Sequence, residues 1–366
     1  MSTVGLDCRF ASALAGLGTF TRNLVHELTA RDDDWSYVLF VKSEHEEWIQ
    51  KLSHTKNLAI REAPFTHYSF QEQTEFPNII QDAECDLFHS PHFNVPLFCP
   101  VPFTSTVHDL ILHRFPNEAA FAKRMAYRFV MRNALKKSKH VFAVSESTKA
   151  EIRSYYGSRI EAKTTVTYPG VSDVFQPQSE VIQEEVKVRY RLEKPFLLYI
   201  GNCKQHKNVG MLIDAFIQAQ LPGIELVLVA GGIECAAFGK RKNIRFMQSV
   251  PLEDLPALYS ASLGCVTATL MEGFCLPLIE AMACKTAVVA TNTGPIPEVC
   301  AEHALLVEPS VTGIAEGIRM LVLDQSIRSS EKLTAANRWA QRFSWKVTAA
   351  QTASVFKSIL EPEGHK

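Results

Sequence analysis

The sequence lacks any apolar run that approaches the roughly 20 residues needed to span a membrane. No signal peptide precedes Val4, so the first residues carry no export signal. These two absences predict a cytoplasmic protein that is soluble, or at most peripheral at the inner face of a membrane.

The chain also lacks an excess of charge of either sign. Its 38 lysine and arginine residues face 39 aspartate and glutamate residues, which gives a formal net charge of −1. A protein held to nucleic acid by its field would show a basic excess, so no nucleic-acid partner is expected. Hydrophobic residues make up 46% of the 366 residues, which is enough for two domains of roughly 150 residues each.

Paired cysteines and metal-binding clusters are missing as well. The nine cysteines are scattered without a Cys-x-x-Cys pair, which predicts buried thiols in a reducing cytosol and no disulfide framework. The acidic run at 32–34 follows an expected helix, not a buried strand, and no second ligand cluster accompanies it. We therefore expect neither a metal site nor a cofactor.

Residues 263–290 carry the clearest pattern in the chain. They predict a strand, a turn around Gly273, a helix with Pro277 in its first turn, and a second buried strand. This order places unpaired backbone N–H groups and a positive helix end against an anion. Glu272 and Glu280 flank the helix start. A phosphate would already bind the N–H groups at the helix start. The hydroxyl groups of a sugar or a ribose are therefore the expected partners of these carboxylates.

Each half of the chain begins with the same arrangement. In the first half, a strand at 4–8 leads through a loop with Gly16 and Gly18 into a helix at 19–30. In the second half, strand, loop and helix follow in the same order over 196–218. A strand, glycine loop and helix let a phosphate approach the backbone. The repeat predicts two Rossmann-like α/β halves with doubly wound sheets.

Two histidines end expected strands of the first half. His89 closes one short strand, and His108 closes the next. Ligands of open parallel sheets bind outside the carboxyl ends of the strands, so both positions fall where a site is expected. For His108 we favour a ligand contact. For His89 a ligand contact and a satisfied core histidine are equally open interpretations.

The pair Glu272-x7-Glu280 is followed by Ala-Met-Ala and then by Pro297-Glu298-Val299. This pattern resembles the retaining nucleotide-sugar glycosyltransferases of family 4, the glycosyl transferases group 1. Three further segments add to the resemblance: GLGTFT at 16–21, VHDL at 107–110 and GNCKQHKN at 201–208. With them, the chain is most similar to bacterial mannosyltransferases of polysaccharide and lipopolysaccharide biosynthesis.

The resemblance implies the GT-B architecture, in which two Rossmann-like, doubly wound α/β domains flank an interdomain cleft. An N-terminal acceptor-side domain would span 1–172, and a linker would follow at 173–194. The nucleotide-sugar-binding domain would span 195–342. A last helix within 343–366 would cross back to the first domain.

The resemblance also implies roles for single residues. His108 would position the transferred sugar, Lys207 would neutralise the donor diphosphate, and Glu272 would hold sugar hydroxyls; these three are the candidate catalytic residues. The other candidate donor contacts are Gly16, Gly18, Asn202, Lys204, Val250, Gly273, Phe274, Cys275, Leu276 and Glu280.

These residues would contact different parts of the donor. The backbone at Gly16 and Gly18 would approach the diphosphate, the N–H groups of 274–276 would stabilise it as it leaves, Glu280 would hold the ribose, and the backbone near Val250 would contact the base. One position departs from the family pattern. Asn202 stands where the family usually has an arginine, which leaves Lys204 as the alternative second cation.

A basic stripe runs along the helix expected over 118–139. Its cations recur at every fourth residue: Arg124, Arg128, Arg132 and Lys136. An apolar row lies beside them: Phe121, Met125 and Phe129. The stripe is either a solvated face beside a core row, or a surface for anionic lipid or the phosphate of an acceptor. Under the second interpretation Arg128, Arg132 and His89 belong to the acceptor side.

The implied reaction transfers a hexose from a nucleoside-diphosphate sugar to a hydroxyl of a saccharide or lipid-linked acceptor. Mannose from GDP-mannose is favoured, a UDP-sugar is next, the anomeric configuration is retained, and no divalent metal is required. A nucleotide-sugar epimerase of the same architecture is the main alternative, and a non-catalytic binding protein is another. A nicotinamide oxidoreductase would need Gly-x-Gly-x-x-Gly, and residues 16–21 lack the third glycine.

Overall fold

The computed structural model describes residues 2–13, 16–50, 52 and 57–361, apart from the side chain of Ile233. The chain divides into two compact units. Unit 1 comprises the chain up to Leu112, Ala119–Gly170 and the chain from Ser344. Unit 2 comprises His113–Glu118 and Val171–Phe343.

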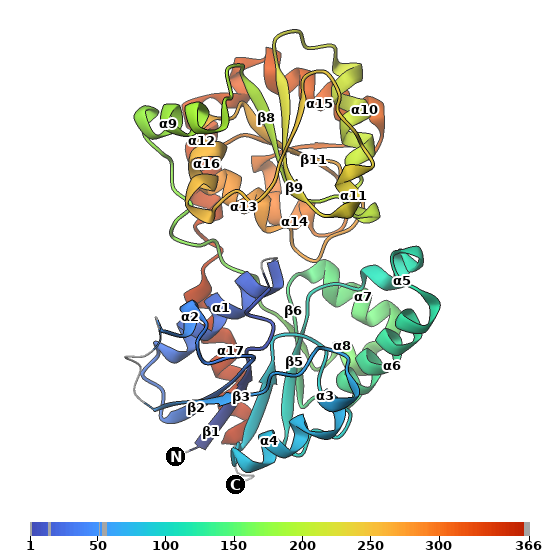
Figure 1. Ribbon diagram of the computed structural model, residues 1–366, viewed down its shortest axis with the longest axis vertical. Helices are drawn as coiled ribbons and strands as arrows, with labels where there is room; N and C mark the ends of the chain where they lie inside the picture. Colours follow the sequence, from blue (N-terminus) through green and yellow to red (C-terminus); the bar gives the residue numbers. More distant parts are fainter. Residues whose placement is uncertain (1, 14–15, 51, 53–56, 362–366) are drawn as a thin grey trace. The chain divides into compact units, whose positions relative to one another are not determined.

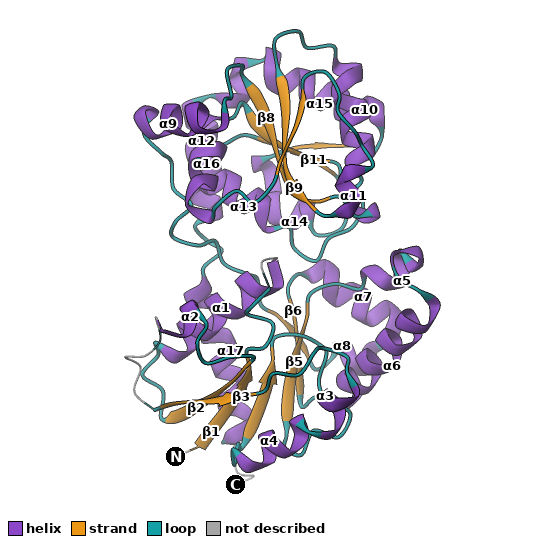
Figure 2. Cartoon of the chain, viewed as in Figure 1, coloured by secondary structure: helices purple, strands orange, loops and turns teal. Residues whose placement is uncertain are grey.

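Unit 1 is built on a seven-stranded parallel sheet with the order β3-β2-β1-β4-β5-β6-β7 (Figures 1 and 2). Its strands are β1 (Ser2–Asp7), β2 (Trp35–Val41), β3 (Leu58–Glu62), β4 (Leu87–Ser90), β5 (Phe103–Val107), β6 (His140–Ala143) and β7 (Thr164–Val166). Its longer helices are α1 (Gly16–Thr29), α4 (Phe76–Asp82), α6 (Phe121–Lys137), α7 (Glu146–Tyr156) and α17 (Trp345–Leu360). Its short helices are α2 (Glu47–Gln50), α3 (Phe70–Thr74) and α8 (Ser158–Glu161), and α5 (Ile111–Arg114) lies at the unit boundary.

Unit 2 repeats this design with a six-stranded parallel sheet of order β10-β9-β8-β11-β12-β13. Its strands are β8 (Phe196–Asn202), β9 (Glu225–Gly231), β10 (Ile244–Met247), β11 (Gly264–Thr267), β12 (Val288–Thr291) and β13 (Leu305–Val307). Its helices are α9 (Glu180–Tyr190), α10 (Val209–Ala219), α11 (Ile233–Ala236), α12 (Leu255–Ala261), α13 (Leu276–Ala283), α14 (Ile296–Cys300), α15 (Val311–Leu323) and α16 (Ser330–Ala340). Short 3₁₀ turns are η1 (Pro116–Glu118), η2 (Gln205–Lys207), η3 (Leu252–Asp254), η4 (Ala301–His303) and η5 (Gln325–Arg328).

The central strands of both sheets are buried along most of their length because helices cover both faces. In unit 1, Phe40, Phe76 and Phe88 form an aromatic cluster with ring centroids 5.5–5.9 Å apart. In unit 2, α10 and α15 pack together, and their buried residues share one apolar cluster with residues of β8 and β9 such as Leu197 and Leu226. In each sheet the strand order reverses beside the first strand, which confirms two doubly wound α/β sheets.

The last helix, α17, is part of unit 1 and packs beside α1 (Figure 1). Trp345 lies edge-on to Phe20 of α1, and the Thr348 hydroxyl donates to the Tyr168 carbonyl at 2.5 Å. Phe356 is fully buried against Phe142 of β6. A segment more than 170 residues away in sequence therefore completes the core of unit 1.

The stretch 173–194, expected as a linker, differs from that expectation because it contains α9. Ser179 caps this helix by accepting the Ile182 N–H. Arg189 pairs with Asp254, and the Tyr190 hydroxyl donates to the same carboxylate at 2.6 Å. These contacts, together with packing on α12, fix α9 within unit 2.

One cysteine pair corrects the expectation that all cysteines are thiols. Cys203 and Cys235 form a disulfide with their Cα atoms 5.2 Å apart. Cys203 follows the end of β8, and Cys235 lies four residues past the end of the neighbouring strand β9. The two strands bring the cysteines together although 32 residues separate them in sequence. The other seven cysteines are unpaired, and all but Cys99 are buried.

Candidate active site

Lys207 and Glu272 form the centre of the candidate site in unit 2. Lys207 Nζ donates to Glu272 Oε1 at 2.5 Å, and the two side chains are only 17% and 9% exposed. Both line a small pocket that Cys275, Pro277 and Leu278 also line. The structure therefore brings two of the three predicted catalytic residues, and one predicted donor contact, to one place at the start of α13.

A network that the sequence did not predict holds the Lys207 loop. Glu118 Oε1 accepts the His206 backbone N–H at 2.9 Å and the His206 Nδ1–H at 2.8 Å. The His206 carbonyl accepts the Thr269 hydroxyl at 3.1 Å and the Leu270 N–H at 2.8 Å. His206 thus links the loop before Lys207 to the loop before Glu272. The residues that meet are 88 and 63 positions apart, so no local signal could have revealed them.

The start of α13 has the features of an anion site. Cys275 is the N-cap residue, adopts a left-handed φ of 77° and makes no side-chain cap hydrogen bond. Pro277 lies in the first turn, as predicted. The predicted backbone contacts Gly273, Phe274, Cys275 and Leu276 precede or begin this helix. Because Cys275 does not cap the helix with its own side chain, the positive end of α13 suits an acceptor such as a phosphate oxygen.

Glu280 lies in the second turn of α13 and is not among the residues lining the Lys207 pocket. The buried Tyr259 hydroxyl donates to Glu280 Oε2 at 3.1 Å. Burial raises the pKa of Glu280 to about 7, and the Tyr259 hydrogen bond opposes that rise. Glu280 therefore changes charge near neutral pH, unlike an ordinary surface carboxylate.

The remaining residues of unit 2 that we expect to contact the donor lie near the ends of strands. Asn202 ends β8, and its Oδ1 accepts the Lys204 N–H at 3.1 Å, so its amide shapes the turn toward η2. Lys204 is exposed on that turn. Val250 follows β10 and is partly buried. All three therefore lie at or just past the carboxyl ends of β8 and β10, the edge of the sheet where ligands of such sheets bind.

His108 lies just past the carboxyl end of β5 in unit 1. Its Nε2 donates to the Pro91 carbonyl at 2.8 Å, and its ring lies edge-on to Phe20. Burial lowers the pKa of His108, which favours the neutral ring. A neutral ring that uses Nε2 as donor has Nδ1 as an acceptor, so His108 can accept a hydrogen bond from a hydroxyl group.

His89 is a core residue in this structure. It is 1% exposed, its Nδ1 lies 2.8 Å from the Thr104 hydroxyl oxygen, and its ring packs against Phe142 and Phe356. Burial alone lowers its pKa to about 3. We therefore assign His89 to the core of unit 1, beneath α17, and not to the acceptor side.

A buried ionic network near the end of β1 is another feature that the sequence did not reveal. Arg9 is fully buried and donates from Nε and a terminal nitrogen to Asp7, both at 2.8 Å. Its other terminal nitrogen lies 2.9 Å from Glu72, which also accepts from Asn94 and the Tyr68 N–H. This network fixes the loops after β1 and β4, which lie at the same sheet edge as His108.

Gly16 and Gly18 were expected in the loop before α1, but both lie in the first turn of that helix, and they differ in what surrounds them. A Cβ on Gly18 would lie 1.8 Å from the Ala13 carbonyl oxygen, whereas a Cβ on Gly16 would meet nothing within 4 Å. Arg22 on α1 donates to the Ala11 and Ala13 carbonyls and holds this loop against the helix. Residues 14 and 15 lie outside the described part of the chain. Gly18 is thus required by the loop itself, and Gly16 is not.

Two alanine substitutions therefore give opposite expectations. Gly18→Ala should displace the loop and lower the free energy of unfolding by about 1–3 kcal/mol, the usual cost of overpacking. Gly16→Ala should leave the melting temperature unchanged but raise the donor KM, because the new methyl group would occupy the space assigned to the diphosphate. Thermal unfolding and donor kinetics separate the two effects. An unchanged donor KM for Gly16→Ala would remove Gly16 from the donor site.

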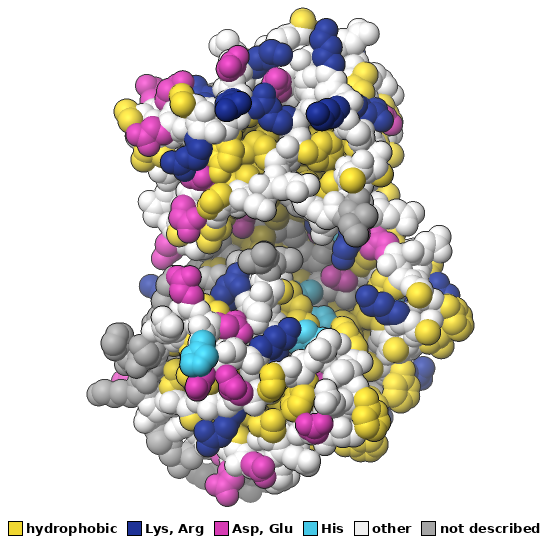
Figure 3. Space-filling model, viewed as in Figure 1, with side chains coloured by type: hydrophobic (Ala, Val, Ile, Leu, Met, Phe, Trp, Pro, Cys, Tyr) yellow, Lys and Arg dark blue, Asp and Glu magenta, His cyan; other side chains and the backbone are white. Residues whose placement is uncertain are grey.

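The apolar row on α6 is exposed, which corrects the interpretation that it belongs to the core. Phe121, Met125 and Phe129 are 68%, 48% and 62% exposed, and apolar side chains gather over α6 in Figure 3. The buried residues of α6 are Tyr127, Met131, Ala134 and Leu135. Arg128 and Arg132 are exposed on the same helix. In the described part of the chain, no helix is long and apolar enough to cross a membrane.

The acidic run at 32–34 lies in an irregular segment between α1 and β2. Asp33 pairs with Arg31 at 2.8 Å, and Asp32 and Asp34 are exposed. Among the described residues, no group of three or more His, Cys, Asp and Glu side chains is arranged to hold a metal ion. An assay with and without a chelator decides whether turnover requires a divalent metal.

Both units match families of known proteins. The family model described as Glycosyltransferase Family 4 matches residues 14–174, and the model described as Glycosyl transferases group 1 matches residues 182–339. O-antigen chain mannosyltransferase B of Escherichia coli is 28% identical over 76% of each chain. O-antigen chain mannosyltransferase RfbU of Salmonella typhimurium is 28% identical over 67% of each chain.

A solved structure, Anabaena HepE in complex with UDP and glucose, matches 98% of this chain and all of its own with a TM-score of 0.77 at 17% identity. That likeness extends over both sheets and supports the GT-B fold. The epimerase alternative receives no support from these comparisons. The two family models together account for most of the chain, which is a GT-B glycosyltransferase of family 4, the glycosyl transferases group 1.

Proposed function

We propose that this glycosyltransferase transfers a mannosyl group from GDP-mannose, or failing that a hexose from a UDP-sugar, to a hydroxyl of a saccharide or lipid-linked acceptor. We further propose that it retains the anomeric configuration and needs no divalent metal. The observation that carries the proposal is the meeting of Lys207, Glu272 and the start of α13 at one pocket. The names of the E. coli and Salmonella relatives support mannose as the sugar. The structure of Anabaena HepE was solved with UDP and glucose, and it supports a UDP-sugar as the second candidate donor.

The chemistry assigns one task to each of these groups. As the bond between C1 of the sugar and the diphosphate breaks, negative charge grows on the leaving diphosphate. Lys207 and the N–H groups at the start of α13 stabilise that charge, and preorganised stabilisation is usually the largest catalytic contribution. Glu272 then accepts hydrogen bonds from sugar hydroxyls, and Glu280 from the ribose. His108, neutral through burial, accepts a hydrogen bond from the transferred sugar.

Retention follows from a front-face route. The acceptor oxygen forms its bond to C1 on the face from which the diphosphate departs, and the hydroxyl proton passes to the leaving phosphate. This route needs no protein nucleophile. It agrees with the sequence, in which no strong nucleophile candidate for the sugar face stands out.

The exposed face of α6 supports a proposal about the acceptor. Arg128 and Arg132 lie on the helix that also exposes Phe121, Met125 and Phe129. A helix with exposed apolar and cationic residues fits peripheral contact with an anionic membrane, where a lipid-linked acceptor would reside. Membrane contact remains a prediction.

A thermal-shift screen tests the donor assignment. GDP or UDP should raise the melting temperature, because a ligand at 100 times its dissociation constant stabilises the protein by about 2.7 kcal/mol. The matching sugar nucleotide should then support turnover in EDTA at the rate seen without it. A protein that neither nucleotide stabilises would contradict the donor assignment. Strict dependence of turnover on magnesium or manganese would contradict metal-independent transfer alone.

A further inference from the structure

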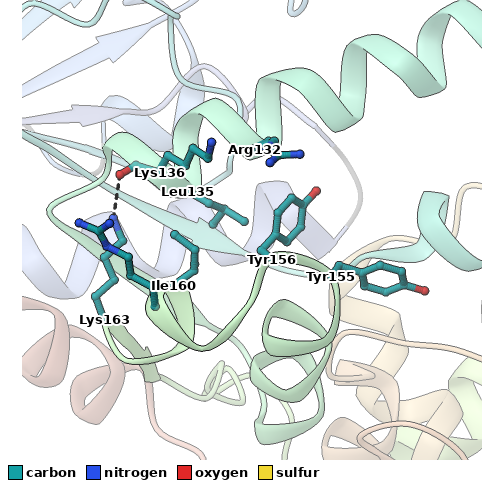
Figure 4. A pocket seen from close by; sticks show the side chains of 8 residues that line it. Arg132, Leu135, Lys136, Tyr155, Tyr156, Ile160 and Lys163 are labelled. Atoms are coloured by element: carbon teal, nitrogen blue, oxygen red, sulfur yellow. Dashed lines mark hydrogen bonds between the residues drawn. The ribbon is translucent and has the colours of Figure 1, made fainter.

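A cationic pocket lies in unit 1 between α6 and the α7–α8 turn. Its volume is about 570 Å³, and its polar lining consists of Arg132, Lys136, Tyr155, Tyr156, Arg159 and Lys163. Figure 4 shows Arg132 and Lys136 on one side, with Tyr156 and Ile160 on the other. Four cations and two phenols thus converge on one hollow, and no carboxylate lines it.

The cations of this pocket are poorly compensated. Lys163 Nζ donates to the Lys136 carbonyl at 3.0 Å and to the Ser138 carbonyl at 2.5 Å, which fixes it at the end of α6. Burial lowers the pKa of Lys163, and the neighbouring charges of Arg159 and Lys139 lower it further. Glu161, the acidic residue of α8, pairs with Arg153 and is not a lining residue. An anion in the pocket would relieve this repulsion.

The pocket is separate from the residues assigned to the sugar. Thr148, in the first turn of α7, donates its hydroxyl to the His108 carbonyl at 3.2 Å. Tyr155 and Tyr156 form the last turn of the same 11-residue helix. Because an α-helix rises 1.5 Å per residue, about 12 Å along the helix separates Thr148 from Tyr156. The hollow therefore lies at the opposite end of α7 from His108.

We propose that this pocket binds a phosphate-bearing ligand, a phosphomonoester or a diphosphate, at a site distinct from the donor site. Guanidinium groups form two parallel hydrogen bonds to phosphate oxygens, and ammonium and phenol groups add single donors. Arg132 and Arg159 approach from different helices and clamp the phosphate between α6 and α8. The apolar side chains of Leu135 and Ile160 contact the rest of the ligand.

Isothermal titration with inorganic pyrophosphate tests the proposal. The titration uses the full chain carrying Lys207→Ala, so that the donor-side cation does not contribute. Adding Arg132→Gln and Arg159→Gln should weaken binding at least tenfold, the scale for losing two charge-assisted hydrogen bonds. Lys346→Gln with Lys357→Gln, at exposed sites outside the pocket and outside α6, removes the same charge and should change affinity less than twofold.

Two results would overturn the proposal: no pyrophosphate binding with the pocket intact, or equal weakening by the pocket and control pairs. A second arm identifies the source of the phosphate. Flotation with vesicles of phosphatidylcholine, with and without phosphatidylglycerol, compares the same two pairs. A loss of vesicle binding confined to the pocket pair indicates a lipid headgroup. Equal vesicle binding, with pyrophosphate binding lost only in the pocket pair, indicates a soluble phosphate compound.

Discussion

Replacing Lys207 with alanine should lower kcat by roughly 10²–10³, the scale for removing one preorganised stabiliser of transition-state charge. In this structure the ammonium is already held at the pocket by Glu272 and needs little reorganisation to face a diphosphate. Because its partner charge grows only as the glycosidic bond breaks, the loss should fall on kcat more than on the donor KM. Steady-state kinetics with the donor varied and the acceptor saturating measure both quantities.

The same substitution also leaves the Glu272 carboxylate without its ammonium partner, and loss of one partner of a largely buried ion pair destabilises a protein. The double variant Lys207→Ala with Glu272→Gln removes that unpaired charge. It should recover thermal stability without recovering kcat. Lys204→Ala, on the same turn but exposed, is the matched control and should lose less than tenfold in rate. If Lys204→Ala instead lost the rate and Lys207→Ala kept it, the phosphate assignment would pass to Lys204.

Glu280→Gln should raise the donor KM about tenfold with little change in kcat, because a ribose makes the same contact before and during transfer. In the wild type, the donor KM should also depend on pH. The pKa of Glu280 is about 7, so the carboxylate becomes protonated as the pH falls through that value and loses acceptor strength toward hydroxyl groups. The wild-type donor KM should therefore rise below about pH 7, whereas that of Glu280→Gln should stay flat through this range.

The control for this change is Glu316→Gln, an exposed carboxylate on α15. It should alter neither kcat nor the donor KM. A fall in kcat for Glu280→Gln at unchanged KM would place Glu280 at the reacting centre and away from the ribose. A wild-type donor KM that stays constant between pH 6 and 8 would show that the protonation of Glu280 does not affect donor binding.

Local sequence patterns revealed the parts of the site that depend on backbone form. Pro277 in the first turn of α13 and the glycines at the start of α1 carry their own signals, because helix starts and close backbone approach each need particular residues. The alternation of strand and helix likewise predicted both sheets. These features depend on neighbours within a few positions, so a single sequence contains them.

Features that depend on distant packing were not readable in the same way. In sequence, His89 and His108 both stand near the end of a strand, but α17 covers His89, and that helix begins more than 250 residues later. The contact between Glu118 and His206 joins segments that share no local pattern. For the Cys203–Cys235 disulfide a signal did exist. Each cysteine closely follows one of two adjacent strands whose register pairs Asn202 with Gly231, but using it required the strand order.

The contribution of α17 to unit 1 has a consequence for the order in which this protein can fold during synthesis. A ribosome synthesises all of Val171–Phe343, nearly the whole of unit 2, before it adds Trp345. Until α17 emerges, the nascent first half lacks the side chain of Phe356 that packs on Phe142 and His89. Synthesis of unit 1 therefore begins before that of unit 2 and ends after it. The apolar surface that α17 covers needs protection throughout translation. For the same reason, an N-terminal half expressed alone must be supplied with α17 in trans or as a fused segment.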